Sequence, residues 1–265
     1  MNFSKYQGTG NDFILIDNRS EDFPISQLLI KKLCDRRFGI GADGLILLQN
    51  QETSDFKMVY FNSDGNESSM CGNGGRCISS FAAQVLNLKN KTSFLAIDGF
   101  HEAKFLSFSD KKSTVALKMN DVVDIEKGEN FYYLNTGSPH YVSFQANLKE
   151  FNLIEEARKI RYSERFKKVG TNVNYLNVEN DKIFLRTYER GVEDETYSCG
   201  TGATAAAIVF AMNNHQIGHQ NISLYTPGGI LNVEFEFDGK KAQNVWLIGE
   251  TVKVFEGIID LNDFQ

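Results

Sequence analysis

The sequence predicts an α+β protein with barrel-like sheets, whose chain consists of two similar halves. Three observations support this fold class. Short strand-like runs bounded by Gly, Asn, Asp or Ser are frequent. Helical stretches are few, and they do not alternate strictly with strands as βαβ units would require. One arrangement of motifs occurs in the first half of the chain and again in the second.

The elements can be placed in chain order. The expected strands are Phe13–Asp17, Leu45–Gln49, Phe56–Asn62, Ser93–Ile97, Thr114–Met119, Tyr132–Asn135, Tyr141–Phe144, Asn174–Val178, Ile183–Tyr188, Asn221–Thr226, Ile230–Phe237, Val245–Ile248 and Val252–Phe255. The expected helices are Ser26–Cys34, Gly74–Leu86, Glu150–Ile160 and Gly202–Asn213. Ser26 suits the N-cap of the first helix because its hydroxyl can accept a backbone N–H of the first turn.

The composition excludes several classes of protein. Of 265 residues, 42% are hydrophobic and 23% are charged, which excludes a disordered chain. The net charge is −6 and no Lys/Arg-rich run occurs, so neither nucleic acid nor a membrane is expected as a partner. No signal peptide and no apolar stretch of membrane-spanning length is recognised. With only four cysteines, the chain is expected in the cytoplasm with reduced thiols.

The repeated arrangement predicts where the chain divides. Each half contains a strand, a polar turn, a Cys-Gly-x-Gly motif and a helix, with the motif at Cys71 and again at Cys199. Turns at Asn11 and Ser138 lie at nearly the same distance upstream of their cysteine. We interpret this register as a duplication. It predicts domains at residues 1–117 and 118–265, with the option that the last strand returns to the first domain.

The run Gly39–Gly44 matches the pattern G-x-G-x-x-G without the context of a dinucleotide site. That site needs a strand before the glycines and a helix after them. Here a helix-like segment precedes them and strand Leu45–Gln49 follows. We therefore expect a helix-to-strand turn whose glycines adopt positive φ angles.

The two cysteine motifs carry the chemical signal. Each places a thiol at the start of a helix, ahead of glycines that allow a ligand to approach the backbone. The N–H groups and partial positive charge of a helix N-terminus lower the pKa of a thiol and attract a carboxylate or phosphate. One such motif is equally well explained by a buried structural cysteine. Two, at equivalent positions of a duplicated chain, are stronger evidence for function.

Two facing thiols fit stereochemical inversion at carbon. One thiolate removes a proton from an α-carbon and the opposite thiol delivers a proton to the other face, while donors aimed at the substrate carboxylate stabilise the transition state. Zinc is disfavoured because five residues separate Cys71 from Cys77, and no Cys-x-x-Cys redox motif occurs. A cysteine hydrolase would need only one thiol. Cys34 and Cys77 are expected to be packing residues.

Further polar residues lie in register with the repeat. His140 follows the turn that corresponds to the one at Asn11, and the sequence leaves a structural role and an active-site role equally supported. Glu189 and Arg190 end the strand that corresponds to the one ending at Asn62. They form either a surface ion pair or the rim of a binding site.

Through these motifs the chain resembles the diaminopimelate epimerase family. The motifs follow the family's order over the whole chain: Gly8-Thr-Gly-Asn-Asp-Phe, Phe38-Gly-Ile-Gly-Ala-Asp-Gly, Phe61-Asn-Ser-Asp-Gly, Cys71-Gly-Asn-Gly-Gly-Arg-Cys, Ser138-Pro-His, Tyr188-Glu-Arg-Gly, Cys199-Gly-Thr-Gly-Ala and Pro227-Gly-Gly. The resemblance implies two pseudo-symmetric domains, each a β-barrel-like sheet around a central helix, with the site in the cleft between them. It also implies a homodimeric isomerase, without cofactor or metal, that interconverts LL- and meso-2,6-diaminopimelate for lysine and peptidoglycan synthesis.

The resemblance also assigns roles to residues. Cys71 and Cys199 correspond to the two acid/base thiols, and His140 and Glu189 to the catalytic residues that support them. The substrate-binding residues correspond to Asn11, Asn62, Gly72, Asn73, Asn172, Glu189, Arg190, Gly200 and Thr201. Two positions depart from the pattern. Gly44 stands where the family often has Gln, and Ser138 stands where Asn often precedes Pro-His.

Two other functions stay open. One is a different cofactor-independent racemase or epimerase of the same fold, such as a proline or histidine racemase. The other is a non-catalytic carboxylate-binding or thiol-redox protein. Replacing either Cys71 or Cys199 by Ala separates these classes, because a racemase would lose inversion whereas a binding protein would keep its ligand.

Overall fold

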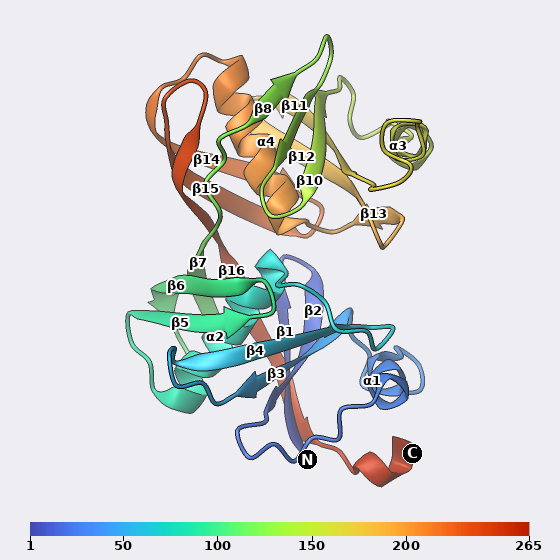
Figure 1. The fold of residues 1–265 in the computed structure, drawn as a ribbon, viewed down its shortest axis with the longest axis vertical. Coiled ribbons are helices and arrows are strands. Elements are labelled where there is room, and N and C mark those ends of the chain that lie inside the picture. The colour runs from blue at the N-terminus through green and yellow to red at the C-terminus, as the bar shows by residue number, and fades with distance from the viewer. Residues whose placement is uncertain (265) are drawn as a thin grey trace. The chain divides into compact units, whose positions relative to one another are not determined.

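The computed structural model describes residues 1–264 and divides into two compact units (Figure 1). Unit 1 comprises Met1–Leu117 together with the chain from Gly249 onward, and unit 2 comprises Lys118–Ile248. The long strand β16 (Ala242–Ile258) belongs to both, because it begins in unit 2 and ends in unit 1.

Unit 1 is a closed barrel. Its other strands are β1 (Asn2–Gly8), β2 (Asn11–Asp17), β3 (Gly44–Gln49), β4 (Phe56–Asn62), β5 (Lys91–Ala96), β6 (Gly99–Phe108) and β7 (Lys112–Lys118). They follow one another from β1 to β7, and β16 then pairs with both β7 and β1. This double pairing removes both free edges of the sheet.

Unit 2 contains a second sheet. Its strands are β8 (Ile125–Lys127), β9 (Tyr132–Asn135), β10 (Pro139–Phe144), β11 (Asn172–Glu179), β12 (Lys182–Glu189), β13 (Asp194–Thr196), β14 (Gly218–Thr226) and β15 (Gly229–Phe237). The order runs β16-β15-β14-β12-β11-β10-β9-β8, and β13 pairs with β12. An isolated bridge joins Val122, just before β8, to Ala242 at the start of β16.

The two units repeat one pairing pattern. In unit 1, β2–β3 is parallel, β3–β4 is antiparallel and β4–β5 is parallel. In unit 2, β10–β11, β11–β12 and β12–β14 repeat this sequence of directions. The pseudo-symmetric α+β fold predicted from the sequence is therefore confirmed.

Each sheet is packed around one helix. In unit 1, α2 (Gly72–Leu86) contacts β1, β2, β3 and β6, and in unit 2, α4 (Gly200–Asn213) contacts β9 to β12, β14 and β15. All side chains from Gly72 to Ala83 are buried, and α4 is buried on nearly every side. Small and apolar residues all round a helix favour such burial, and α4 fits this rule, whereas α2 also buries the polar Asn73 and Arg76. Two shorter helices, α1 (Gln27–Cys34) and α3 (Leu153–Arg161), lie at the flanks of their units (Figure 1).

Differences from the predicted elements have local causes. Strands β1, β6, β8 and β13 were not predicted. In β1 the alternation of polar and apolar residues is hidden by Lys5, which is buried and pairs with Asp12 at 2.8 Å. The last two predicted strands are one, since β16 is continuous. Ser26 is the N-cap of α1, but its side chain makes no capping hydrogen bond.

The turn after α1 is confirmed as a helix-to-strand connection. α1 ends at Cys34 and β3 begins at Gly44, and Gly41 between them has a φ of 80°. Such a φ favours glycine. The expected positive φ is thus found at Gly41 alone, whereas at Gly39 a β-carbon would lie 2.2 Å from the backbone oxygen of Lys32 and at Gly44 it would meet β4.

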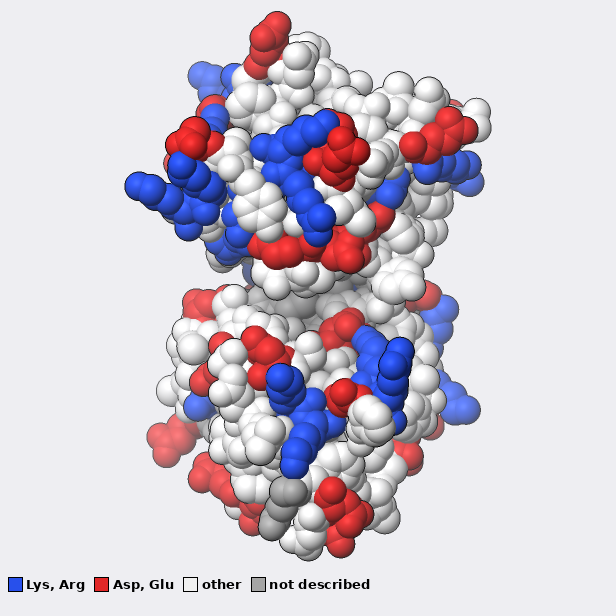
Figure 2. All heavy atoms as spheres, turned by 90° about the vertical axis from the view of Figure 1, so that its right-hand side faces the viewer, with Lys and Arg blue, Asp and Glu red and all other residues white. Residues whose placement is uncertain are grey.

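The surface agrees with the composition. On the face shown in Figure 2, basic and acidic side chains are interspersed over each unit instead of forming a field of one sign. Within residues 1–264, no helix combines the length and apolarity needed to span a membrane.

Candidate active site

Each of the two motif cysteines is the N-cap of the helix inside its own unit. Cys71 precedes α2 with φ −94° and ψ 134°, and Cys199 precedes α4 with φ −122° and ψ 114°. The first hydrogen bonds of the helices run from the N–H of Gly75 to the carbonyl of Cys71 (2.7 Å) and from the N–H of Ala203 to that of Cys199 (2.8 Å). The N–H groups of both first turns thus point out of the helix ends beside a thiol.

In unit 1, Asn11 and Asn73 lie beside Cys71, and we call these three residues the Cys71 cluster. The Sγ of Cys71 lies 3.5 Å from the Oδ1 of Asn11, which also accepts from the Nδ2 of Asn73 at 3.3 Å. The Nδ2 of Asn11 donates to Asp43 at 2.7 Å. Because a carboxylate only accepts, this bond directs the carbonyl oxygen of Asn11 toward the thiol.

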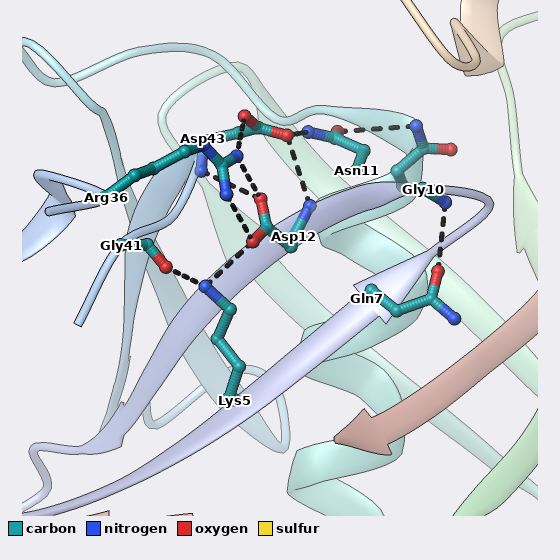
Figure 3. A network of polar contacts seen from close by, with 9 residues as sticks. Lys5, Gln7, Gly10, Asn11, Asp12, Arg36, Gly41 and Asp43 are labelled. Atoms are coloured by element: carbon teal, nitrogen blue, oxygen red, sulfur yellow. Dashed lines mark hydrogen bonds and ion pairs between the residues drawn. The ribbon is translucent and has the colours of Figure 1, made fainter. Parts of the chain in front are cut away.

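An ion-pair network of Lys5, Asp12, Arg36 and Asp43 contacts Asn11 through Asp43 (Figure 3). Arg36 bonds to Asp12 at 2.7 Å and to Asp43 at 2.6 Å, and Lys5 pairs with Asp12 at 2.8 Å. Lys5 also donates to the carbonyl of Gly41. Burial opposes ionisation of Asp12, but the hydrogen bonds from Arg36 and Lys5 outweigh it and hold the pKa of this carboxyl below its usual range. Asp12 therefore stays ionised at neutral pH, and the network, through Asp43, fixes the orientation of Asn11.

In unit 2, a chain of hydrogen bonds leads to Cys199, and we call Cys199, Thr201, His140 and Asn174 the Cys199 cluster. The Nδ2 of Asn174 donates to the carbonyl of Tyr141 at 2.9 Å and lies 3.0 Å from the Nδ1 of His140. Since that carbonyl only accepts, the group facing Nδ1 is an N–H donor and Nδ1 is the acceptor. The hydrogen of the ring is then on Nε2, which donates to the Oγ1 of Thr201 at 2.9 Å.

The chain of hydrogen bonds in unit 2 ends at the sulfur of Cys199. The Oγ1 of Thr201 lies 3.4 Å from the Sγ of Cys199. Because this oxygen accepts from His140, its own hydrogen is available to the sulfur. A hydroxyl hydrogen directed at a sulfur favours the thiolate over the thiol.

His140 is a neutral donor. It is fully buried, and burial together with the positive charge of Arg190 lowers the pKa of His140 to about 3. The imidazole is thus uncharged at neutral pH. The geometry places His140 in hydrogen-bond contact with Thr201 and Asn174, and its active-site role stays a prediction.

Asn172 joins the start of β11 to the end of β12. Its Nδ2 donates to Ser138 at 2.9 Å and to the carbonyl of Pro139 at 3.1 Å, and its Oδ1 accepts the N–H of Arg190 at 2.8 Å. The guanidinium of Arg190 donates to the carbonyl of Val169 at 2.8 Å. Ser138, where the family often has Asn, is therefore a hydrogen-bond partner of Asn172.

The remaining predicted residues lie at strand or helix ends. Gly72 and Gly200 are the first residues of α2 and α4. Asn62 ends β4, is exposed, and pairs with Gly44 in the β3–β4 ladder. Glu189 ends β12 and accepts from the hydroxyl of Thr196 at 3.0 Å.

Gly44 has a steric reason for being glycine. A β-carbon at this position would lie 2.5 Å from the backbone oxygen of Phe61 and 2.6 Å from the ring of Tyr60. No side chain fits without moving β4. The Gln that the family often carries there would thus require a different local backbone.

Sequence reasoning missed Asn174, Asp43 and Arg76. The signal for Asn174 was present, because Asn172 and Asn174 are two apart in a strand and so share a face. Asn174 also explains why residue 202 is a glycine, because a β-carbon there would lie 2.5 Å from the Oδ1 of Asn174. This glycine makes room for Asn174, whereas the sequence suggested room for a ligand.

The other two cysteines behave as packing residues. Cys34 and Cys77 are 3% and 0% exposed, and burial raises the pKa of each thiol to about 12. Across residues 1–264, no group of three His, Cys, Asp or Glu side chains is arranged to hold a metal ion.

Comparisons with known proteins give one consistent result. The model of the family described as Diaminopimelate epimerase matches residues 3–116 and 132–254. A diaminopimelate epimerase of Flavobacterium psychrophilum is 50% identical over 261 residues, which cover 98% of this chain and 100% of the relative. One of Aquifex aeolicus is 39% identical over 274 residues, which cover 97% of each chain.

Solved structures share the fold at low identity. A phenazine biosynthesis protein of the PhzF family from Bacillus anthracis superposes with a TM-score of 0.77 at 14% identity, covering 98% of this chain and 99% of that one. A hydroxyproline epimerase from Agrobacterium vitis, solved with trans-4-hydroxy-L-proline, gives a TM-score of 0.71 at 12% identity, with 98% and 90% covered.

Proposed function

The chain belongs to the diaminopimelate epimerase family, and on this premise we propose that it interconverts LL- and meso-2,6-diaminopimelate with Cys71 and Cys199 as its two acid/base thiols. The observation that carries the proposal is the equivalent placement of the two thiols. Each is the N-cap of the buried helix of a unit, and each has a side-chain hydrogen-bond partner, Asn11 or Thr201.

The proposed reaction is a proton transfer at the α-carbon. One thiolate takes the α-proton from one face, and the other thiol gives a proton to the opposite face, which inverts the centre. The electrons of the broken C–H bond move toward the α-carboxylate. We propose that the N–H groups of the helix ends at Gly72, Asn73, Gly200 and Thr201 bind this carboxylate, because such ends stabilise negative charge.

The two thiols have different surroundings. Beside Cys71 stands the carbonyl oxygen of Asn11, which can accept the hydrogen of a thiol. Beside Cys199 stands the hydroxyl of Thr201, which can donate to a thiolate. We propose that His140 supports the second thiol through Thr201, and that Glu189 is a further supporting residue.

Exchange of the α-proton tests the proposal. In D₂O without added cofactor, the chain should exchange the α-hydrogens of diaminopimelate and interconvert the LL and meso forms, followed by NMR. Cys71→Ala and Cys199→Ala should each abolish interconversion, while Cys34→Ala, at a packing cysteine, should retain it. Interconversion that survives either catalytic substitution would overturn the two-thiol assignment.

We propose that Asn62, Asn172, Glu189 and Arg190 select the distal end of the substrate. That end carries an ammonium and a carboxylate, which suit a Glu acceptor and an Arg donor respectively. The N–H of Arg190 is held by Asn172 at 2.8 Å, and Glu189 is held by Thr196. Lysine and alanine, which lack one or both distal charges, should react far more slowly. Equal rates would favour a general racemase of this fold.

The homodimer, the cytoplasmic location and the role in lysine and peptidoglycan synthesis stay predictions from the family resemblance. Size-exclusion chromatography with light scattering tests the first. Growth of a lysine-requiring strain that lacks its own epimerase, with and without this chain, tests the last.

A further inference from the structure

Arg76 is a buried cation that lies one turn beyond Cys71 on α2. It is 0% exposed, and its guanidinium reaches only neutral acceptors: the carbonyl of Gly72 at 3.2 Å, the hydroxyl of Thr9 at 3.4 Å and the Oδ1 of Asn73 at 2.8 Å. Its Nε has no hydrogen-bond partner within the described chain. No ion pair joins it to a carboxylate of residues 1–264, whereas Arg36, Arg161 and Arg186 each pair with an acid.

This placement is unfavourable by itself. A buried charge is costly unless it is paired, and a cation near the N-terminal end of a helix is repelled by the helix dipole. Gly8 of β1 packs next to the site, since a β-carbon there would lie 3.4 Å from the Nη2 of Arg76, and Arg76 has no exposed surface. Water is thus kept from the guanidinium, and the charge must be balanced from inside the protein.

Few ionisable groups can provide the negative charge that balances Arg76. Burial lowers the pKa of Arg76, and negative charge on the sulfurs of Cys77 and Cys71 opposes this effect. Cys77 is fully buried and remains a neutral thiol, since burial raises its pKa to about 12. Cys71 is partly exposed and stands at the helix end, where a thiolate is stabilised.

The duplicated unit provides an internal comparison. The position equivalent to Arg76, five residues after the cysteine, is Thr204 in α4. The hydroxyl of Thr204 donates to the carbonyl of Gly200 at 3.1 Å, as the Nη1 of Arg76 does to Gly72 at 3.2 Å. A neutral hydroxyl is therefore sufficient for this bond, and the positive charge of Arg76 serves another purpose.

We propose that Arg76 is a positioning residue that provides the fixed counter-charge for the Cys71 thiolate. It also orients the Cys71 cluster, because its bond to the Oδ1 of Asn73 directs the Nδ2 of Asn73 toward Asn11. Only the catalytic use of the Cys71 thiolate depends on the proposed function, whereas the counter-charge does not.

Alkylation tests the counter-charge without turnover. The full chain is treated with iodoacetamide at a series of pH values, and modification of Cys71 and Cys199 is quantified by peptide mass spectrometry. Arg76→Met should raise the midpoint for Cys71 by at least about one pH unit, which slows its alkylation about tenfold below the midpoint. Arg76→Lys should keep the midpoint near that of the parent, and Thr204→Val should leave Cys71 unchanged.

The midpoint for Cys199 in the same digests is the control. An unchanged Cys71 midpoint in Arg76→Met, or equal shifts of both cysteines, would overturn the proposal. If Arg76→Met does not fold, the parent protein decides, since a Cys71 midpoint at or above that of an ordinary thiol, about 8.5, is incompatible with a fixed counter-charge. Interconversion that survives Cys71→Ala would overturn the proposed function and leave this result intact.

Discussion

Asn174 and His140 lie 3.0 Å apart, amide Nδ2 to imidazole Nδ1, and this contact determines which ring nitrogen carries the hydrogen. The second hydrogen of the amide is held by the carbonyl of Tyr141, so the amide cannot turn around without losing that bond. The tautomer of a buried histidine is thus set by a residue that does not itself reach the sulfur of Cys199.

Asn174→Asp should reverse the tautomer. A carboxylate accepts where the amide donated, so the Nδ1 of His140 should become protonated. In protein labelled with ¹⁵N-histidine, its Nδ1 resonance should move from the unprotonated to the protonated range. Asn177→Asp, on the same strand β11, is the control and should leave the resonance in place. An unprotonated Nδ1 in Asn174→Asp would contradict the assigned tautomer.

Thr201→Val should separate His140 from Cys199. The substitution keeps the shape of the side chain and the backbone N–H but removes the hydroxyl that links the two residues. Hydrogen bonds to charged groups contribute about 1.5–3 kcal/mol, so kcat should fall about ten- to hundredfold. Thr201→Ser should stay within a few-fold of the parent. Equal kcat values for the Val and Ser variants would remove the hydroxyl from the mechanism.

His140 should make the fold sensitive to acid. Burial and Arg190 lower its pKa from 6.5 to about 3 in the folded chain. Between these values the unfolded chain binds a proton that the folded chain does not, so the free energy of unfolding falls as pH falls from about 6.5 toward about 3. The contribution of this residue approaches about 1.4 kcal/mol for each pH unit.

Urea denaturation between pH 6.5 and pH 4.5 measures this effect. The stability advantage of the parent over His140→Gln should shrink as the pH is lowered. His219→Gln, which removes an exposed imidazole, is the control variant. An advantage that stays constant over this range would mean that His140 titrates normally.

Gly44→Ala should destabilise unit 1. Its methyl group would lie 2.5 Å from the backbone oxygen of Phe61, and a backbone atom cannot move away as a flexible side chain can. The expected cost is about 1–3 kcal/mol, measured by urea denaturation. Gly74→Ala is the comparison, because the nearest atom there is the mobile Cδ1 of Ile46 at 3.2 Å. Similar free energies of unfolding for the two variants would show that the backbone of β4 can move at Phe61 to accommodate the methyl group.

The sequence predicted the two motif cysteines better than the residues that surround them. Glycines and cysteines in a repeated order are visible without any structure, and they placed Cys71 and Cys199 at the starts of α2 and α4. Two strands were found with their bounds: β9, whose burial alternates, and β4, which is a short apolar run ending at the polar Asn62.

Residues that act through long-range contacts were harder to predict. Asp43 reaches Asn11 from 32 positions away, and Asn174 reaches His140 from 34. The sequence indicated Arg76 only as part of a motif, because its burial results from packing of α2 inside the sheet, including contact with Gly8 of β1. Strand β6 was missed because its apolar residues Phe100, Leu106 and Phe108 lie at exposed positions, so the alternation of its burial does not appear as an alternation of polarity in the sequence.

Because strand β16 is shared by both units, the barrel of unit 1 can be completed only after unit 2 has been synthesised. In unit 1, Asn2 of β1 pairs with Ile258, a partner that is translated only after the whole of unit 2. Until β16 is released, β1 and β7 are open strand edges that can pair with other nascent chains. Unit 2 is one continuous segment and is complete earlier. Unit 1 is thus the first to begin synthesis and the last to complete its fold. Termination of translation before Gly249 would leave the barrel of unit 1 open.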